Sequence, residues 1–156
     1  AQQVSCHHGS RGRSDMIKNK GAFNSKLRKH LSDSTRHIQK SVTRSVIYVQ
    51  GVAQKNIMTG SKTGPMVRKY NPNRQHQSSA AGESPASDTG FLVGSISHRV
   101  IKQGTAVIGE VVASADYAAA LEFGTVNMKA RPFLQPALDK SANKVKSIFK
   151  QEGLIR

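Results

Sequence analysis

The side chains with acid–base or metal-binding chemistry are scattered along this chain. The histidines are His7, His8, His30, His37, His76 and His98. None of them stands at metal-ligand spacing from a cysteine or a carboxylate. Cys6, His7 and His8 adjoin one another in a polar stretch near the N-terminus, and we do not expect them to form a native metal site. The sequence therefore predicts no metal site and no cofactor.

Nucleophile and phosphate-loop patterns are also absent from the sequence. Ser95 follows Gly94, but the surrounding residues do not form the strand-to-helix elbow of a hydrolase. The stretch from Gly60 to Gly64 contains Lys62 and Thr63, yet it lacks the spacing of a phosphate-binding loop and no strand precedes it. We therefore expect that the protein is not an enzyme and has no catalytic residues.

Two carboxylates are better explained by structure than by catalysis. Asp88 precedes Thr89 and Gly90, a pattern typical of a turn. Glu122 stands beside Phe123 and is expected to accept hydrogen bonds, either from Arg131 or from backbone N–H groups. We favour a structural ion pair for Glu122 over a role as a general acid or base. Asp116 and Glu110 are the other acids that we considered for a carboxylate pair.

Charge is concentrated in the first half of the chain. The formal net charge is +15, and residues 1–75 hold 15 basic and 2 acidic side chains against 9 and 7 in residues 76–156. Such asymmetry indicates an anionic partner, either nucleic acid or an acidic protein surface, although a solvated basic helix face is an equally good explanation. Cys6 is the single cysteine, so no intramolecular disulfide can form. We expect no membrane-spanning segment and no secretory signal.

The elements that must position these residues follow from hydrophobic spacing. We expect a flexible basic arm over 1–21, one α+β domain over 22–152 and a short tail over 153–156. The apolar stripe of the first predicted helix is Phe23, Leu27, Leu31, Ile38, Val42, Val46, Val49, Ala53 and Ile57. Gly60 should end this helix, Gly51 marks a candidate bend, and the β-branched run Val46–Val49 leaves a strand as the alternative.

The second half of the chain predicts a small sheet and a C-terminal helix. Residues 60–88 form an extended loop without a persistent period, which we expect to order against a neighbouring molecule. A helical turn over 91–95 precedes strands over 96–101 and 105–113, joined by a turn at Gln103 and Gly104, and the second strand should be central because both of its faces are apolar. Residues 117–123 form a helical turn or a strand. The last helix begins near Pro132 and Pro136, with a stripe formed by Leu134, Leu138, Ala142, Val145 and Phe149.

Two motifs in this half resemble the HK97 gp10-like family of bacteriophage morphogenesis proteins. The first runs from Ser84 to Ile96 and contains the Asp-Thr-Gly turn. The second contains Tyr117-Ala118, Glu122-Phe123-Gly124-Thr125 and the run from Ala130 to Ala137. The order of the elements is also similar over about residues 22–150. The residues that we expect to serve structure or interfaces are Asp88, Thr89, Gly90, Leu92, Tyr117, Glu122, Phe123, Gly124, Thr125, Arg131, Pro132, Phe133 and Pro136.

This resemblance implies a virion protein of the neck or tail-completion type. It implies an antiparallel sheet packed against a long helix, and a homo-oligomeric ring, hexameric or dodecameric, around the DNA channel. The implied partners are head-connector or head-closure proteins and tail proteins, with non-specific contact to DNA in the channel and no membrane. The implied location is the virion, with assembly in the host cytoplasm. The resemblance carries over no catalytic residues. A basic nucleic-acid-binding module is the alternative.

Overall fold

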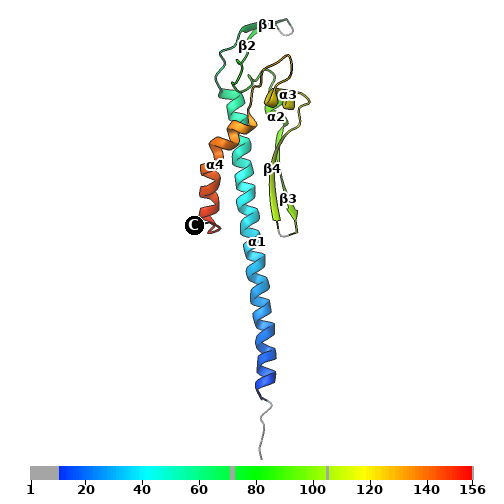
Figure 1. The fold of residues 1–156 in the computed structure, drawn as a ribbon, viewed down its shortest axis with the longest axis vertical. Coiled ribbons are helices and arrows are strands. Elements are labelled where there is room, and N and C mark those ends of the chain that lie inside the picture. Colours follow the sequence, from blue (N-terminus) through cyan, green and yellow to red (C-terminus); the bar gives the residue numbers. More distant parts are fainter. Residues whose placement is uncertain (1–10, 71–72, 105, 156) are drawn as a thin grey trace, which may run out of the picture. The chain divides into compact units, whose positions relative to one another are not determined.

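The computed structural model describes residues 11–70, 73–104 and 106–155, with the backbone alone for 11–19. Its elements, in chain order, are α1 (Arg11–Thr59), β1 (Met66–Tyr70), β2 (Asn73–Gln77), α2 (Phe91–Ser95), β3 (Ile96–Gln103), β4 (Ala106–Ala113), α3 (Ala118–Phe123) and α4 (Leu134–Gln151). Helices combined with two small antiparallel sheets confirm the predicted α+β class (Figure 1). The chain divides into two compact units, Ala1–His37 and Ile38–Arg156.

Helix α1 is longer than the sequence pattern predicted. It begins at Arg11, twelve residues before Phe23, so residues 11–21, which we expected to form a flexible arm, are helical, while residues 1–10 lie outside the described part of the chain. This segment contains no proline, and Arg, Met and Lys are good helix formers, although Gly12 and Gly21 each disfavour helix by up to about 1 kcal/mol relative to alanine. The helix continues through Gly51 and ends where predicted, with the Gly60 N–H donating to the Asn56 carbonyl at 2.8 Å.

The predicted apolar stripe of α1 is exposed in its first part and buried in its second part. In the unit Ala1–His37, the side chains of Phe23, Leu27 and Leu31 are exposed. In the unit Ile38–Arg156, the later positions Val46, Val49, Ala53 and Ile57 are buried. The helical spacing therefore identified core residues only in the second unit.

Strands β3 and β4 form the predicted hairpin, paired in register from Ile96 with Ala113 to Gln103 with Ala106. The expectation that the second strand is central is wrong, because β4 pairs with β3 alone among the described strands. Both faces of β4 are apolar for a different reason. Gly109 and Val111 face α1, whereas Ile108 and Val112 lie on the outer face and are partly exposed.

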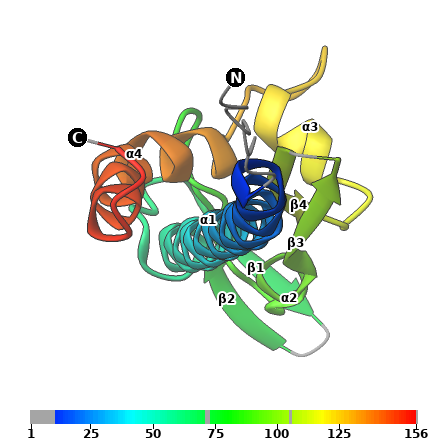
Figure 2. The same ribbon diagram turned by 90° about the horizontal axis from the view of Figure 1, so that it is seen from below.

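The main core lies where α1, α2, α3 and α4 meet in the second unit. Phe133, Ile57, Ala53 and Ala137 are fully buried there. The remaining members of this cluster are Leu92, Ile96, Ala115 and Ala118. Side chains of α1 also bind the backbone beside this core: the Gln50 amide donates to the Ile96 carbonyl at 2.8 Å and the Gln54 amide to the Val93 carbonyl at 3.1 Å. Within this unit, α4 and the β3–β4 hairpin lie on different sides of α1 (Figure 2).

The loop over 60–88 contains structure that the sequence did not predict. Strands β1 and β2 form an antiparallel hairpin within it, in register from Met66 with Gln77 to Tyr70 with Asn73. Most of its side chains are exposed, so no apolar alternation marks it in the sequence. Backbone pairing continues beyond β2, since the Ser78 N–H donates to the Pro65 carbonyl at 3.1 Å and the Gly64 N–H to the Ser78 carbonyl at 3.0 Å.

Helix α4 begins where the prolines predicted, but its buried face differs from the predicted stripe. The buried positions are Ala137, Ser141 and Ile148, while Leu138 and Ala142 are exposed. Small side chains at Ala137 and Ser141 allow close packing, and the Ser141 hydroxyl is satisfied by the Ala137 carbonyl at 2.6 Å. The larger apolar residues of the predicted stripe are consequently left at the edge of the core.

We predict that Gly109→Ala destabilises the second unit. An added Cβ would lie 2.5 Å from Val46 Cγ1 and 2.7 Å from Val42 Cγ1, so β4 must move away from α1. The valines cannot give way easily, because β-branched side chains have one preferred rotamer in a helix. The expected loss is about 1–3 kcal/mol in the free energy of unfolding, measured by urea denaturation.

The matched control is Gly51→Ala, since Gly51 lies in α1 with nothing within 4 Å of the added Cβ. The free energy of unfolding of this variant should rise by about 0.5–1 kcal/mol, because alanine has a higher helix propensity than glycine. Equal stabilities for the two variants would contradict the close approach of β4 to α1.

Candidate functional site

The carboxylate of Glu122 occupies the start of α4. Its Oε2 accepts the N–H groups of Phe133 at 2.8 Å and Leu134 at 3.0 Å, and its Oε1 accepts the N–H of Gln135 at 2.9 Å. The first N–H groups of a helix have no partner within the helix, and the helix dipole favours a negative charge at this end. Glu122, the next-to-last residue of α3, therefore caps α4 from eleven residues away. Of the alternatives expected for Glu122, backbone N–H groups are the observed donors, and the favoured ion pair is not observed among the described residues.

The chain between α3 and α4 makes a tight turn. Gly124 has φ of +78°, and a Cβ there would lie 2.9 Å from both the Ala130 nitrogen and the Met128 oxygen. Both the positive φ and the close approach of the backbone therefore require glycine at this position. Thr125 and Met128 exchange two backbone hydrogen bonds, at 2.8 Å and 3.2 Å. The Arg131 N–H donates to the Leu121 carbonyl at 2.7 Å and closes the base of the turn.

Phe133 and the prolines fix the other side of this corner. Phe133, one of the residues expected to serve structure or interfaces, is fully buried. The Pro132 carbonyl accepts a hydrogen bond from the Ser84 hydroxyl at 3.4 Å. Pro136 lies in the first turn of α4, where a backbone N–H would have no partner within the helix, so proline costs no hydrogen bond there. Glu122, Gly124, Arg131, Pro132, Phe133 and Pro136 thus meet at one corner. Phe123 is instead 83% exposed and contributes nothing to the core.

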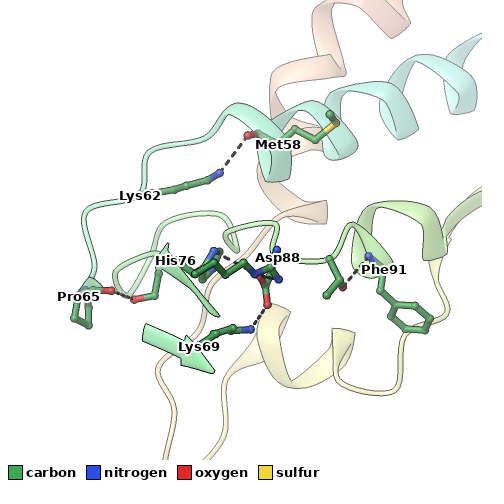
Figure 3. A network of polar contacts seen from close by, with 10 residues as sticks. Met58, Lys62, Pro65, Lys69, His76, Asp88 and Phe91 are labelled. Carbon is green, nitrogen blue, oxygen red and sulfur yellow. Dashed lines mark hydrogen bonds and ion pairs between the residues drawn. The ribbon is translucent and has the colours of Figure 1, made fainter. Parts of the chain in front are cut away.

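The first motif forms a second cluster around Asp88. The Asp88 carboxylate pairs with Lys69 and Arg74 from the β1–β2 hairpin, and His76 Nδ1 lies 3.8 Å from Asp88 Oδ1 (Figure 3). The hydrogen bond from Lys69 and the charges of Arg74, Lys69 and His76 hold the pKa of Asp88 below its usual value, against an opposing effect of burial. Asp88 is therefore more than a turn former, because it anchors the unpredicted hairpin to the rest of the second unit.

The residues that follow Asp88 support the same cluster. The Thr89 hydroxyl accepts the Phe91 N–H at 3.4 Å (Figure 3). Gly90 has φ of +80°. Leu92 is buried, and the Phe91 ring lies 6.3 Å from that of Tyr117. Tyr117 and Arg131 also line a hollow of about 270 Å³ with the Asp88 turn, so the two sequence motifs meet in space.

Glu83 is a structural carboxylate that the sequence reasoning missed. It accepts the N–H groups of Thr63 at 3.0 Å and Ala80 at 2.8 Å, and the Thr63 hydroxyl at 2.8 Å. The Thr63 N–H, then the Ala80 N–H and the Thr63 hydroxyl, lower the pKa of Glu83 despite some desolvation. The available signal was an acidic residue in a Gly-, Ser- and Pro-rich loop, because the backbone N–H groups of such loops need hydrogen-bond acceptors.

An open apolar groove lies beside the Glu122 corner. It has a volume of about 670 Å³ and lies between α1, β4, α3 and α4. Leu134, Leu138, Val145 and Phe149 from α4 line it, which explains the predicted α4 stripe. Val46 and Val111 face them from α1 and β4. The groove was not predictable, because helical spacing alone does not say which apolar residues meet a neighbour.

The described residues offer no metal site, since no three His, Cys, Asp or Glu side chains gather there. Cys6, His7 and His8 lie outside the described part of the chain. No helix formed by the described residues is long and apolar enough to cross a membrane. Comparison of the chain with family models, curated proteins and solved structures finds no match. The resemblance to the phage family therefore rests on the two motifs.

We predict that Glu122→Ala destabilises the fold more than a surface ion-pair deletion does. The substitution removes the acceptor for three N–H groups, two of them partly buried, which should cost about 1–3 kcal/mol in chemical denaturation. The control is Glu110→Ala, which removes the exposed pair with Arg99 and should cost less than about 1 kcal/mol. A Glu122→Ala variant no less stable than the control would refute the capping role.

We also predict that Asp88 makes stability depend on acidity. Because its pKa is lowered in the fold, the stabilisation is present in full above its ordinary pKa of 3.8 and is lost as the pH falls through the lowered pKa. Asp88→Asn should therefore be less stable than the wild type at neutral pH, with a gap that narrows below pH 3.8.

Denaturation curves across pH measure this gap. The control is Asp116→Asn, at an exposed position, which should follow the wild-type curve. A gap between wild type and Asp88→Asn that stays constant through the acid range would show that the ion pairs of Asp88 contribute nothing.

Proposed function

We propose that this chain is a structural subunit of a bacteriophage neck or tail-completion ring, which joins the head connector to the tail around the DNA channel. The observation that carries the proposal is the role of the motif residues. Glu122 caps α4, Gly124 permits the turn, Phe133 fills the core and Asp88 anchors a hairpin. The two motifs that resemble the phage family thus hold shape, as expected in a subunit that works through contacts with other molecules.

The surface of the second unit supports the same proposal. It carries the open apolar groove, whose lining includes the exposed ring of Phe123, and the partly exposed outer face of β4. Fully buried interface patches are more apolar than ordinary surface. A ring also needs two different patches on each subunit, because a rotation that closes a ring joins unlike surfaces. The proposed partners are further copies of this chain, head-connector or head-closure proteins and tail proteins.

A basic nucleic-acid-binding module is the second candidate, favoured by one observation. The first 75 residues hold 15 of the 24 lysines and arginines, and those described on α1 between Lys20 and Lys40 are exposed. Such a surface binds phosphates without sequence preference. The two candidates overlap, because a neck ring encloses DNA.

The protein should form closed oligomers, hexameric or dodecameric. Size-exclusion chromatography with light scattering over a range of concentrations measures the mass, and negative-stain electron microscopy shows whether the particles are rings. A protein that remains monomeric at high concentration, without and with a connector, would contradict the proposal.

The same measurements with duplex DNA separate the two candidates. Ring assembly that needs no DNA supports the structural subunit. A monomer whose affinity for duplex DNA falls steeply between 50 and 200 mM salt, as counterion release demands, would favour the nucleic-acid-binding module instead.

A further inference from the structure

The turn after α3 presents an apolar side chain that does not pack against its own subunit. Val126 stands at the tip of this turn and is fully exposed. The turn is rigid, because Thr125 and Met128 close it with two hydrogen bonds and Arg131 N–H binds Leu121 at its base. In Figure 2 the segment after α3 projects outward. A preorganised apolar projection loses little conformational entropy on binding, which is a feature of good interfaces.

The groove beside α4 is the matching concave surface on the same chain. Its walls are formed mainly by valine and leucine side chains, together with Phe123 and Phe149. Its volume of about 670 Å³ exceeds what one valine fills, so neighbouring atoms of the inserted turn fit as well. Val126 does not line the groove of its own subunit. The chain therefore carries a projecting apolar side chain and an open apolar groove that this side chain does not fill.

We propose that the Val126 turn of one copy inserts into the apolar groove of a second copy. This inference rests on the ring proposed above and names the contact that builds it. The two surfaces are different patches of one chain, so the contact is heterologous, and its repetition produces a closed ring or a filament.

Charge at the edges of the two surfaces is consistent with a second copy as the occupant. Lys129, on the turn, is exposed. Asp139 is the acidic residue of α4, next to Leu138, and its carboxylate accepts the Gln135 amide at 3.1 Å at the groove edge. Helix α4 also carries Lys140, Lys144, Lys146 and Lys150, so the turn must seat with Lys129 toward Asp139 and away from these lysines. Such a charge arrangement favours one orientation and faster association more than it favours affinity.

Two single variants of the full-length chain test the contact. Val126→Asp places a charge on the turn, and Leu138→Asp places a charge in the groove wall. Both positions tolerate charge in the isolated subunit, since Val126 is fully exposed and Leu138 is 52% exposed. Each variant alone should lose assembly, with an apparent dissociation constant raised at least about thirty-fold, as for a central interface residue.

An equimolar mixture of the two variants provides the decisive result. The Val126→Asp variant keeps an intact groove and the Leu138→Asp variant keeps an intact turn, so the mixture retains one working contact. It should form a dimer and stop there, as measured by light scattering. Lys129→Glu combined with Asp139→Lys should assemble better than either single charge reversal.

The matched control is Ile47→Asp, because Ile47 is an aliphatic residue on a helix with 50% exposure that does not line the groove. This variant should assemble like the wild type. Circular dichroism melting shows that each variant is folded.

Assembly of either single variant at wild-type strength would overturn the Val126 contact and leave the ring proposal standing. A mixture that stays monomeric would also overturn it, in favour of a symmetric contact or a different protein in the groove. A wild-type chain that never assembles would overturn both proposals.

Discussion

Three backbone N–H groups at the start of α4 depend on a single carboxylate, that of Glu122. This contact joins α3 to α4 across the intervening turn. Phe133, whose N–H is one of the three, is also fully buried in the core. The position of α4 against α1, the shape of the apolar groove and the direction of the Val126 turn therefore follow from one corner. A capped helix start next to a buried aromatic ring is a rigid support for the groove and the turn that we propose as contact surfaces.

Local sequence signals predicted the elements that have strong local causes. Gly60 ends α1, Gly104 turns the β3–β4 hairpin, and Pro132 and Pro136 mark the start of α4. The β1–β2 hairpin was not predicted because its strands are short, mostly polar and exposed, and therefore lack an apolar pattern. Backbone pairing and the Asp88 ion pairs stabilise it instead. Spacing alone also misassigned β4 as central, because its inner face packs on a helix and its outer face is partly exposed.

The structure gives several of the chosen site residues contacts that the sequence did not specify. Glu122 was expected to accept hydrogen bonds, but only the structure distinguishes the backbone donors from Arg131. The groove could not be predicted from the sequence, because it depends on how α4 is rotated about its axis. Ala137 and Ser141 face the core, and this rotation leaves Leu138 and Phe149 for the groove. The motif residues stabilise the fold, and the groove and Val126 are apolar surfaces without a partner in the subunit. Both features are consistent with the proposed subunit of an assembly.

Amide hydrogen exchange at the start of α4 tests the central claim most directly. In the wild type, the N–H groups of Phe133 and Leu134 should exchange slowly, because the Glu122 carboxylate holds them. In a Glu122→Gln variant, exchange at these two positions and at Gln135 should accelerate, while the paired amides of β3 and β4 keep their wild-type rates. Fast exchange of Phe133 and Leu134 in the wild type, or an equal acceleration across the whole second unit, would contradict the account.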